Sequence, residues 1–277
     1  ETLCINPELI EELITKKTKA IIAVHYAGVA CDMDKIMTLA DDYNLFVVED
    51  AAQAIDSYYT GKDRVRRPLG SIGHFGCFSF HETKNIQCGE GGMLVINDKR
   101  FAQRAEIIWE KGTNRAEFYR GEVNKYGWVD TGSSFLPSDI LAAFLFAQLE
   151  NLDEIQNKRM QIWDYYFEGL KSLTEKNFFK LPFIPEYSTC NNHMFYLVCN
   201  SGKERDMLIS NLKTKGIWTV FHYLSLHTSP YYYDKHDGRD LPESDKYSDC
   251  LVRLPFFYSL YEENQKRVIE KISEFYL

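Results

Sequence analysis

The sequence has 277 residues, of which 45% are hydrophobic and 26% charged, and its formal net charge is -8. This length and apolar content suit one large domain or two smaller ones and exclude a globally disordered chain. The acidic balance disfavours generic binding of nucleic acid, although a local basic patch would still be able to hold a phosphorylated small molecule.

The cysteines and the N-terminal segment indicate the compartment. Seven cysteines are widely spaced, their number is odd, and no Cys-x-x-Cys pair occurs. This usage indicates reduced thiols rather than a disulfide framework or a zinc site, so we expect no metal. The first residues form no signal peptide, and no apolar run approaches the length of a membrane span. We therefore expect a cytoplasmic protein without a membrane or nucleic-acid partner.

The first half of the chain alternates short apolar runs with helical patterns. Apolar residues at helical spacing predict helices over residues 7–17, 32–44 and 99–112. Runs rich in β-branched residues predict strands over residues 19–28, 45–50, 76–80 and 91–98. Strands and helices that alternate in this way favour βαβ units, and hence a mainly parallel sheet with helices on both faces.

The second half changes in character. Residues 117–132 read as a polar, aromatic loop, and residues 137–170 as one or two long helices with Ser138 as the N-cap. Further on, strands are predicted over residues 192–200, 217–223 and 251–257, and helices over residues 202–216 and 262–277. This order predicts a large α/β domain over residues 1–155, followed by a linking helix and a small α+β domain over residues 156–277.

Three polar residues follow predicted strands, where ligands bind in open parallel sheets. Asp50 ends one strand, Ser79 lies at the end of another, and Lys84 comes five residues later. Singly, they are most often a helix N-cap, a turn residue and a solvated charge. Together they fit pyridoxal phosphate: an amine for its aldehyde, a carboxylate for its pyridine nitrogen, and a hydroxyl for its phosphate. The sequence therefore predicts a pyridoxal-phosphate enzyme.

Longer segments resemble a known family. They include "VVEDAAQAIDSYYTGK", "LGSIGHFGCFSFHETKNIQCGEGGMLVIND", "HMFYL" and "FHYLSLH". They are similar to the DegT/DnrJ/EryC1/StrS sugar aminotransferases over nearly the whole chain. The resemblance implies the aspartate-aminotransferase-like fold of PLP-dependent enzymes (fold type I) and a homodimer with shared active sites.

The resemblance also implies roles for residues near the cofactor. Lys84 resembles the lysine that forms the Schiff base, and Asp50 the partner of the pyridine nitrogen. Gln53 resembles the residue that lies against the ring near its phenolic oxygen, and Ser79 a phosphate ligand. His81 and the glycines after it are interpreted as framework.

Substrate-binding residues follow from the resemblance in two further segments. Tyr126, Trp128 and Ser133 lie in "YGWVDTGSS", which resembles a loop that reaches into the neighbouring subunit's site. His222 and Tyr223 resemble a motif near the sugar nucleotide. From the residues alone, His222 would be a packed strand histidine.

The predicted reaction moves an amino group, with glutamate as donor, to C4 of a dTDP-4-keto-6-deoxyhexose for surface-polysaccharide biosynthesis. Sugar dehydratases on this scaffold are a weaker alternative, because they carry histidine where this chain has Lys84. Three cations in or just before the predicted loop, Arg115, Arg120 and Lys125, would attract the nucleotide diphosphate.

A further alternative rests on the N-terminus. Relatives have a segment before the position of Glu1, with a turn that cradles the phosphate and an aromatic residue that stacks on the cofactor ring. Neither is found here, and the chain does not begin with Met. We therefore expect an N-terminally incomplete large domain, and a non-catalytic remnant or nucleotide-sugar-binding subunit stays open as an alternative.

Overall fold

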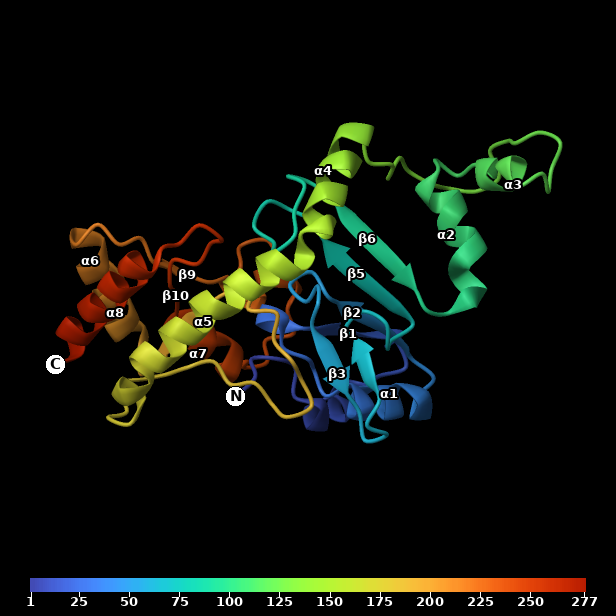
Figure 1. Cartoon of the computed structure of the whole chain (residues 1–277). Helices are drawn as coiled ribbons and strands as arrows, with labels where there is room; N and C mark the ends of the chain where they lie inside the picture. Colours follow the sequence, from blue (N-terminus) through green and yellow to red (C-terminus); the bar gives the residue numbers. More distant parts are fainter. The chain divides into compact units, whose positions relative to one another are not determined.

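The structure is a computed structural model that describes all 277 residues, Glu1–Leu277 (Figure 1). The chain forms two compact units. The sheet unit comprises Cys4–Leu152 and Glu186–Cys190, and the C-terminal unit comprises Glu1–Leu3, Asp153–Pro185 and Asn191–Leu277. Each unit has its own hydrophobic core.

The sheet unit is built on a four-stranded sheet in the order β1-β2-β5-β6. Its strands are β1 Ala20–Val24, β2 Phe46–Asp50, β5 Phe75–Ser79 and β6 Gly92–Ile96. Strands β1, β2 and β5 run parallel, whereas β6 runs antiparallel to β5. The four predicted strands are confirmed: β1, β2 and β6 are shorter than predicted, and β5 is shifted by one residue. The sheet is mixed but mostly parallel.

One face of this sheet carries the core of the unit. Helix α1, Met33–Asp42, packs against β1 and β2 and is capped by Asp32, whose side chain accepts the Lys35 N–H. Ile36 of α1 and Val47 of β2 are fully buried in this core. The helix predicted over residues 32–44 is therefore confirmed, because its apolar stripe meets the apolar face of the strands.

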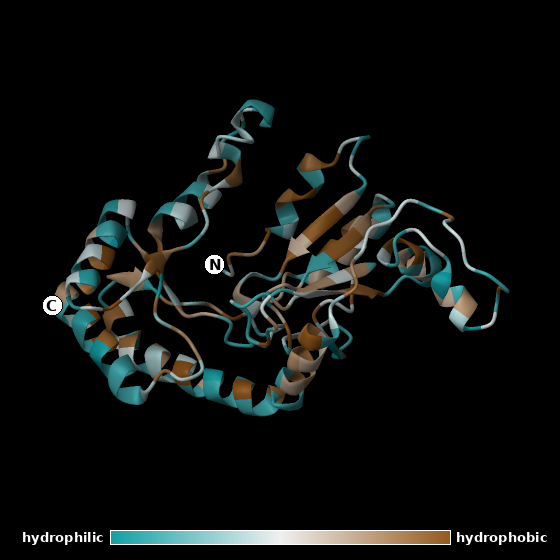
Figure 2. Cartoon of the chain, turned by 90° about the horizontal axis from the view of Figure 1, so that it is seen from above, coloured by the Kyte–Doolittle hydropathy of each residue, from teal (hydrophilic) through white to brown (hydrophobic).

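Much of the other face is exposed, so the prediction of helices on both faces is wrong for this chain. Burial alternates along β1, and Ile22 is 61% exposed while Ile21 is buried. Leu94 of β6 is 53% exposed on the same face. Figure 2 shows that the strands are nonetheless apolar along much of their length. The continuous apolar runs that predicted two covered faces therefore reflect β-strand composition, not burial on both sides.

The helix predicted over residues 7–17 is also wrong. The segment forms two short 3-10 helices, η1 Pro7–Leu9 and η2 Glu11–Leu13, and Ile14 is extended. Leu9 and Leu13 are more than half exposed, and Ile10 alone is buried. Without an apolar surface to receive these leucines, the helical spacing gains too little to hold a regular helix.

A small hairpin was not predicted. Strands β3 Tyr58–Thr60 and β4 Arg66–Pro68 pair antiparallel, and η3 Tyr26–Gly28 follows β1. Each strand has only three residues, which is too short for an alternating pattern to stand out in the sequence.

An arm, defined here as residues 102–136, follows β6 (Figure 1). It contains α2 Ala102–Trp109, after the 3-10 helix η4 Lys99–Phe101, and α3 Arg115–Tyr119. The predicted loop over residues 117–132 therefore begins inside α3. Helix α4, Asp139–Glu150, comes next, and Ser138 caps it by accepting the Leu141 N–H, as predicted.

The C-terminal unit begins within the helix α5, Leu152–Thr174. Its sheet has the order β7-β8-β10-β9, and all neighbouring strands run antiparallel. The strands are β7 Phe179–Lys180, β8 Tyr196–Cys199, β9 Val220–Phe221 and β10 Leu251–Arg253; the helices are α6 Gly202–Thr214, α7 Pro242–Cys250 and α8 Glu262–Tyr276, with short 3-10 helices η5 Leu226–Thr228 and η6 Tyr233–Lys235.

The predicted elements of this unit are confirmed, with much shorter strands, while β7 and α7 were not predicted. The start signals of α7 are a proline and two acidic residues in the first turn. None of the helices in either unit combines the length and the apolar character that a membrane span requires.

Candidate active site

Asp50 and Ser79 lie on the same face of the sheet, at the carboxyl ends of neighbouring parallel strands. Asp50 ends β2 and pairs in register with Cys77 of β5. Ser79 lies two residues beyond Cys77, at the end of β5. Because side chains alternate between faces, Asp50, Cys77 and Ser79 all belong to the exposed face. The structure thus brings two of the predicted cofactor residues to one edge.

The Asp50 carboxylate stabilises a turn, not a helix. Its Oδ1 accepts the Ala52 N–H at 3.0 Å, and no helix follows β2. The helix-cap interpretation of this residue is therefore wrong. Its Oδ2 accepts no hydrogen bond within the protein, so one oxygen remains available to a ligand. Burial raises the pKa of the Cys77 thiol, and the negative charge of Asp50 raises it further.

Lys84 lies in a loop, Phe80–Gly91, that folds back on itself. Phe80 N–H donates to the Gly91 carbonyl at 2.8 Å, and Glu82 N–H donates to the Gly89 carbonyl at 2.9 Å. At the tip, the Lys84 N–H donates to the His81 carbonyl at 2.9 Å, which closes a turn. These bonds fix the backbone on both sides of Lys84, so the lysine extends from an ordered turn.

Ser79 marks the start of this loop. Its Oγ accepts the His81 N–H at 3.3 Å. This contact does not use the hydroxyl proton, so the hydroxyl can still donate a hydrogen bond to an anion. A serine at a strand end, beside an ordered loop, is therefore suited to hold a phosphate group.

Gln53 has a structural partner. Its Oε1 accepts the Ala27 N–H at 2.7 Å. Ala27 lies in η3 with a φ of 56°, in the left-handed region that costs energy for a residue with a side chain. Gln53 therefore stabilises a strained turn after β1, and its predicted place beside the cofactor ring stays a prediction.

A buried carboxylate beside Asp50 was missed from the sequence. Glu49 is 0% exposed, and its Oε2 accepts His25 Nε2–H at 2.9 Å and the Gly70 N–H at 2.8 Å. Its Oε1 accepts the N–H groups of Ile72 and Gly73, both at 2.6 Å. Burial alone would raise the pKa of Glu49, but the hydrogen bonds from His25 and from the two glycines outweigh it and lower this pKa.

The partner histidine is held in one tautomer. His25 is 0% exposed, and its Nδ1 accepts the Cys31 N–H at 3.1 Å, so the ring proton lies on Nε2 toward Glu49. The backbone around Glu49 is equally tight. A Cβ on Gly76 would lie 2.1 Å from the Gly70 carbonyl oxygen, so only glycine fits there. A charged residue within an apolar strand was the one available signal for this cluster, and it did not reveal the partners.

The three arm residues predicted to bind substrate lie apart from Lys84 in sequence and are exposed. Val129 N–H donates to the Gly112 carbonyl at 2.8 Å, and Ser133 N–H donates to the Ile108 carbonyl at 3.0 Å. The segment with Tyr126, Trp128 and Ser133 is thereby fixed to the C-terminal end of α2. Trp128 is nevertheless 81% exposed.

Both arginines that are predicted to attract the nucleotide diphosphate are paired with carboxylates of the arm. Arg115 Nη1 lies 3.4 Å from a carboxylate oxygen of Glu110. Arg120 contacts both Glu106, at 2.9 Å, and Glu122, at 2.8 Å. The acidic residues that neutralise these cations are close in the fold, and sequence spacing did not reveal them.

His222 and Tyr223 follow β9 in the C-terminal unit, whereas Asp50, Ser79 and Lys84 belong to the sheet unit. The rings of His222 and Tyr223 lie 4.3 Å apart between centroids, and Tyr223 is largely exposed. The predicted site residues are therefore distributed over both units.

The residues present fit pyridoxal phosphate. The donor set at the sheet edge comprises an amine on an ordered turn, a carboxylate with one oxygen available, and a hydroxyl with a proton to donate. These are the groups that the aldehyde, the pyridine nitrogen and the phosphate of the cofactor require.

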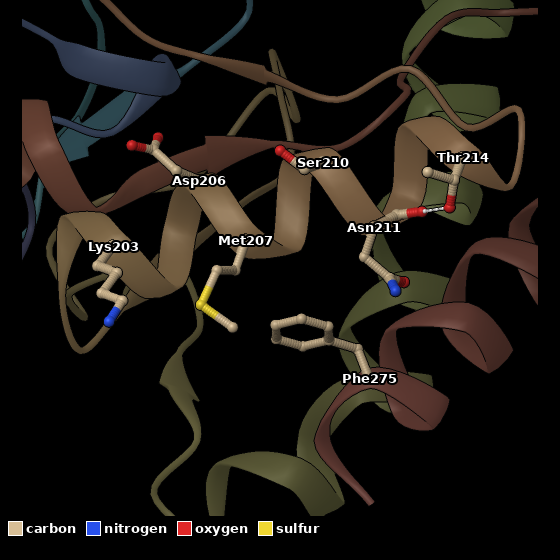
Figure 3. A pocket seen from close by; sticks show the side chains of 7 residues that line it. All are labelled: Lys203, Asp206, Met207, Ser210, Asn211, Thr214 and Phe275. Atoms are coloured by element: carbon tan, nitrogen blue, oxygen red, sulfur yellow. Dashed lines mark hydrogen bonds between the residues drawn. The ribbon is translucent and has the colours of Figure 1, made fainter.

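A hollow of about 760 Å³ lies elsewhere, on the surface of the C-terminal unit (Figure 3). Lys203, Asp206 and Met207 of α6 line it, and Phe275 of α8 points toward Met207. It contains none of the predicted site residues.

Solved structures of aminotransferases share this fold. The aminotransferase from Psychrobacter cryohalolentis superposes with a TM-score of 0.89 at 28% identity, over 99% of this chain and 73% of that protein. DesV from S. venezuelae, solved with a ketimine intermediate, superposes with a TM-score of 0.83 at 30% identity. This match covers 98% of this chain and 68% of the DesV chain.

A third structure was solved in a PLP form. It is the putative sugar aminotransferase Spr1654 from Streptococcus pneumoniae, with a TM-score of 0.83 at 25% identity, over 99% of this chain and 72% of that protein. A sequence model of the DegT/DnrJ/EryC1/StrS aminotransferase family matches residues 1–273. This chain therefore belongs to the DegT/DnrJ/EryC1/StrS aminotransferase family.

Proposed function

We propose that this chain is a PLP-dependent nucleotide-sugar aminotransferase. It moves an amino group from glutamate to C4 of a dTDP-4-keto-6-deoxyhexose in surface-polysaccharide biosynthesis, which is the reaction of a dTDP-4-amino-4,6-dideoxygalactose transaminase. The observation that carries the proposal is the placement of Asp50 and Ser79 on one face, at the ends of β2 and β5, with Lys84 on the turn that follows.

Each residue has a defined task in this proposal. When bound, the cofactor supplies an aldehyde that carries the amino group and a ring that accepts electrons from the reacting carbon. Lys84 Nζ would hold the aldehyde of the cofactor, and its amine would move a proton between the two reacting carbons. Asp50 Oδ2 keeps the ring nitrogen protonated through its negative charge. Ser79 Oγ donates to the phosphate.

The proposed site is shared between two copies of the chain. Helix α4 is apolar on all sides, yet Ile140 is 82% exposed and Phe146 is 63% exposed. A helix of this composition is normally buried, so a second subunit would cover it.

We propose that the arm, with Tyr126, Trp128 and Ser133, completes the partner's site, and that His222 and Tyr223 contact the sugar nucleotide. We further propose that residues 1–155 hold the cofactor and that the enzyme is cytoplasmic.

The test of the cofactor proposal is covalent trapping. Borohydride reduction after incubation with pyridoxal phosphate, followed by peptide mapping, should place the label on Lys84. Lys84→Ala and Lys84→Arg should both abolish turnover and labelling, because a guanidinium cannot replace the amine. Label on another lysine, with none on Lys84, would contradict the proposal.

The shared site is tested by mixing two inactive variants. Lys84→Ala and a variant altered at Ser133 and Ser134 should together regain activity, because each mixed dimer has one intact site. Light scattering should show a dimer. A monomer, or mixed dimers that stay inactive, would count against the shared site.

A further inference from the structure

His81 holds the turn that carries Lys84 through two of its own groups. Its carbonyl accepts the Lys84 N–H at 2.9 Å. Its ring Nδ1 accepts the Thr83 N–H at 3.2 Å and lies 2.9 Å from the Thr83 hydroxyl. The backbone N–H groups of Thr83 and Lys84 therefore both donate to His81. A side chain that accepts the N–H two residues further on stabilises a turn in the way an asparagine does.

The other nitrogen of the ring faces the returning strand of the loop. His81 Nε2 lies 3.7 Å from a carboxylate oxygen of Glu90. Because Nδ1 accepts a hydrogen bond, the ring proton of the neutral imidazole is on Nε2 and points toward Glu90. The distance is too long for a well-made hydrogen bond, and the Glu90 side chain is 82% exposed. The Nδ1 contact is therefore the stronger of the two.

We propose that His81 is a positioning residue for Lys84, and that it positions the lysine through the hydrogen bond that its Nδ1 accepts. By holding the Thr83 N–H, it fixes the backbone from which the Lys84 side chain extends and so sets where the amine is presented. This rests on the proposed function in one respect, that Lys84 is the reactive lysine. His81 itself touches neither the cofactor nor the substrate in this proposal.

Two substitutions separate the two nitrogens. In His81→Asn, the amide oxygen takes the place of Nδ1 and can still accept the Thr83 N–H. In His81→Gln, the longer side chain places a donor where Nε2 stood and leaves the Thr83 N–H without its acceptor. His81→Ala removes both contacts. Two further variants are controls: Thr83→Ala keeps the backbone N–H, and Glu90→Gln removes only the charge that faces Nε2.

The measurement is the reactivity of Lys84 relative to the exposed Lys62, in the full chain without turnover. Each variant is labelled with pyridoxal phosphate and borohydride, and in parallel with acetic anhydride, and the two lysines are quantified by peptide mapping. We expect His81→Ala and His81→Gln to lower the ratio about tenfold, the effect of losing one hydrogen bond at the turn. His81→Asn and both controls should stay within about twofold of the starting protein.

The outcomes are distinguishable. If His81→Asn behaves like His81→Ala while thermal unfolding shows both folded, or if all three His81 variants keep the Lys84 ratio and lose only stability, the positioning role is overturned. If the starting protein takes no pyridoxal label on Lys84, the proposed function fails. The acetic anhydride ratios still decide whether Nδ1 of His81 positions the amine.

Discussion

Two adjacent carboxylates on β2 have opposite surroundings. Glu49 points into the core, is 0% exposed and accepts four hydrogen bonds. Asp50 points to the exposed face, is partly buried and accepts one hydrogen bond, from Ala52. Residues one apart in a strand face opposite sides, so the same strand end supplies a structural anion and an available one.

The difference indicates which carboxylate has an oxygen available to a ligand. A buried carboxylate whose oxygens are all satisfied is stable where it lies and has no capacity left for a ligand. Asp50 keeps one oxygen without a protein donor, at the edge where Ser79 and the Lys84 turn also lie. We therefore expect changes at Glu49 to affect folding, and changes at Asp50 to affect activity.

The largest expected effect is at Asp50. Asp50→Asn keeps the size and can still accept the Ala52 N–H, but it removes the charge that would keep the ring nitrogen protonated. We expect kcat/KM to fall at least about a hundredfold, which corresponds to about 3 kcal/mol of lost transition-state stabilisation. The free energy of unfolding, measured by urea denaturation, should change by less than about 0.5 kcal/mol. A variant with near-normal turnover would show that the turn contact is the whole role of Asp50.

The opposite result is expected at Glu49. In Glu49→Gln, one of the two oxygens becomes an NH₂ group that faces buried N–H donors, whichever way the amide points. Each unsatisfied buried donor costs about 1–3 kcal/mol, so we expect a loss of about 3 kcal/mol in the free energy of unfolding. Urea denaturation measures it.

A milder variant keeps this prediction testable if Glu49→Gln fails to fold. His25→Gln removes the ring but keeps a donor that can reach Glu49, and we expect it to lose less stability than Glu49→Gln. If the starting protein and both variants had the same free energy of unfolding, the buried cluster would contribute nothing to stability.

Sequence reasoning singled out the exposed partner of this pair and missed the buried one. The positions of Asp50, Ser79 and Lys84 after strands could be predicted because the apolar runs are visible, and they became candidates because ligands bind at such ends. Glu49 differs, since its partners His25, Gly70 and Gly73 come from two other segments. No local pattern joins them, and only the folded chain brings their donors to one carboxylate.

The same limit explains the wrong predictions. Residues 7–17 have helical spacing, but the spacing does not show that Leu9 and Leu13 lack an apolar surface to pack on. The apolar runs of β1 and β2 do not show that one side of the sheet stays exposed. Arg120 reads as a free cation until the fold brings Glu106 beside it. Local propensity is visible in the sequence, whereas tertiary partners are not.

The buried pair also predicts a dependence on pH. The folded pKa of Glu49 is lower than its unfolded value near 4.5, so folding is favoured by its ionised form. This contribution is fully present above that unfolded value and is lost as the pH falls through the folded pKa. We expect stability to fall more steeply below about pH 4.5 in the starting protein than in Glu49→Gln. Parallel slopes, measured by urea denaturation across this range, would exclude Glu49 as the cause.

The smallest expected effect separates two roles of Gln53. Its Oε1 accepts the Ala27 N–H in the left-handed turn, so Gln53→Ala should cost about 1 kcal/mol in the free energy of unfolding. Gln53→Glu keeps an acceptor at the same place and should restore most of that stability. If Gln53 also lies against the cofactor ring near its phenolic oxygen, the added negative charge should weaken pyridoxal phosphate binding in Gln53→Glu although the fold is restored. The measurements are the free energy of unfolding and the affinity for pyridoxal phosphate in both variants. If Gln53→Glu recovers both the stability and the affinity, Gln53 serves the turn alone.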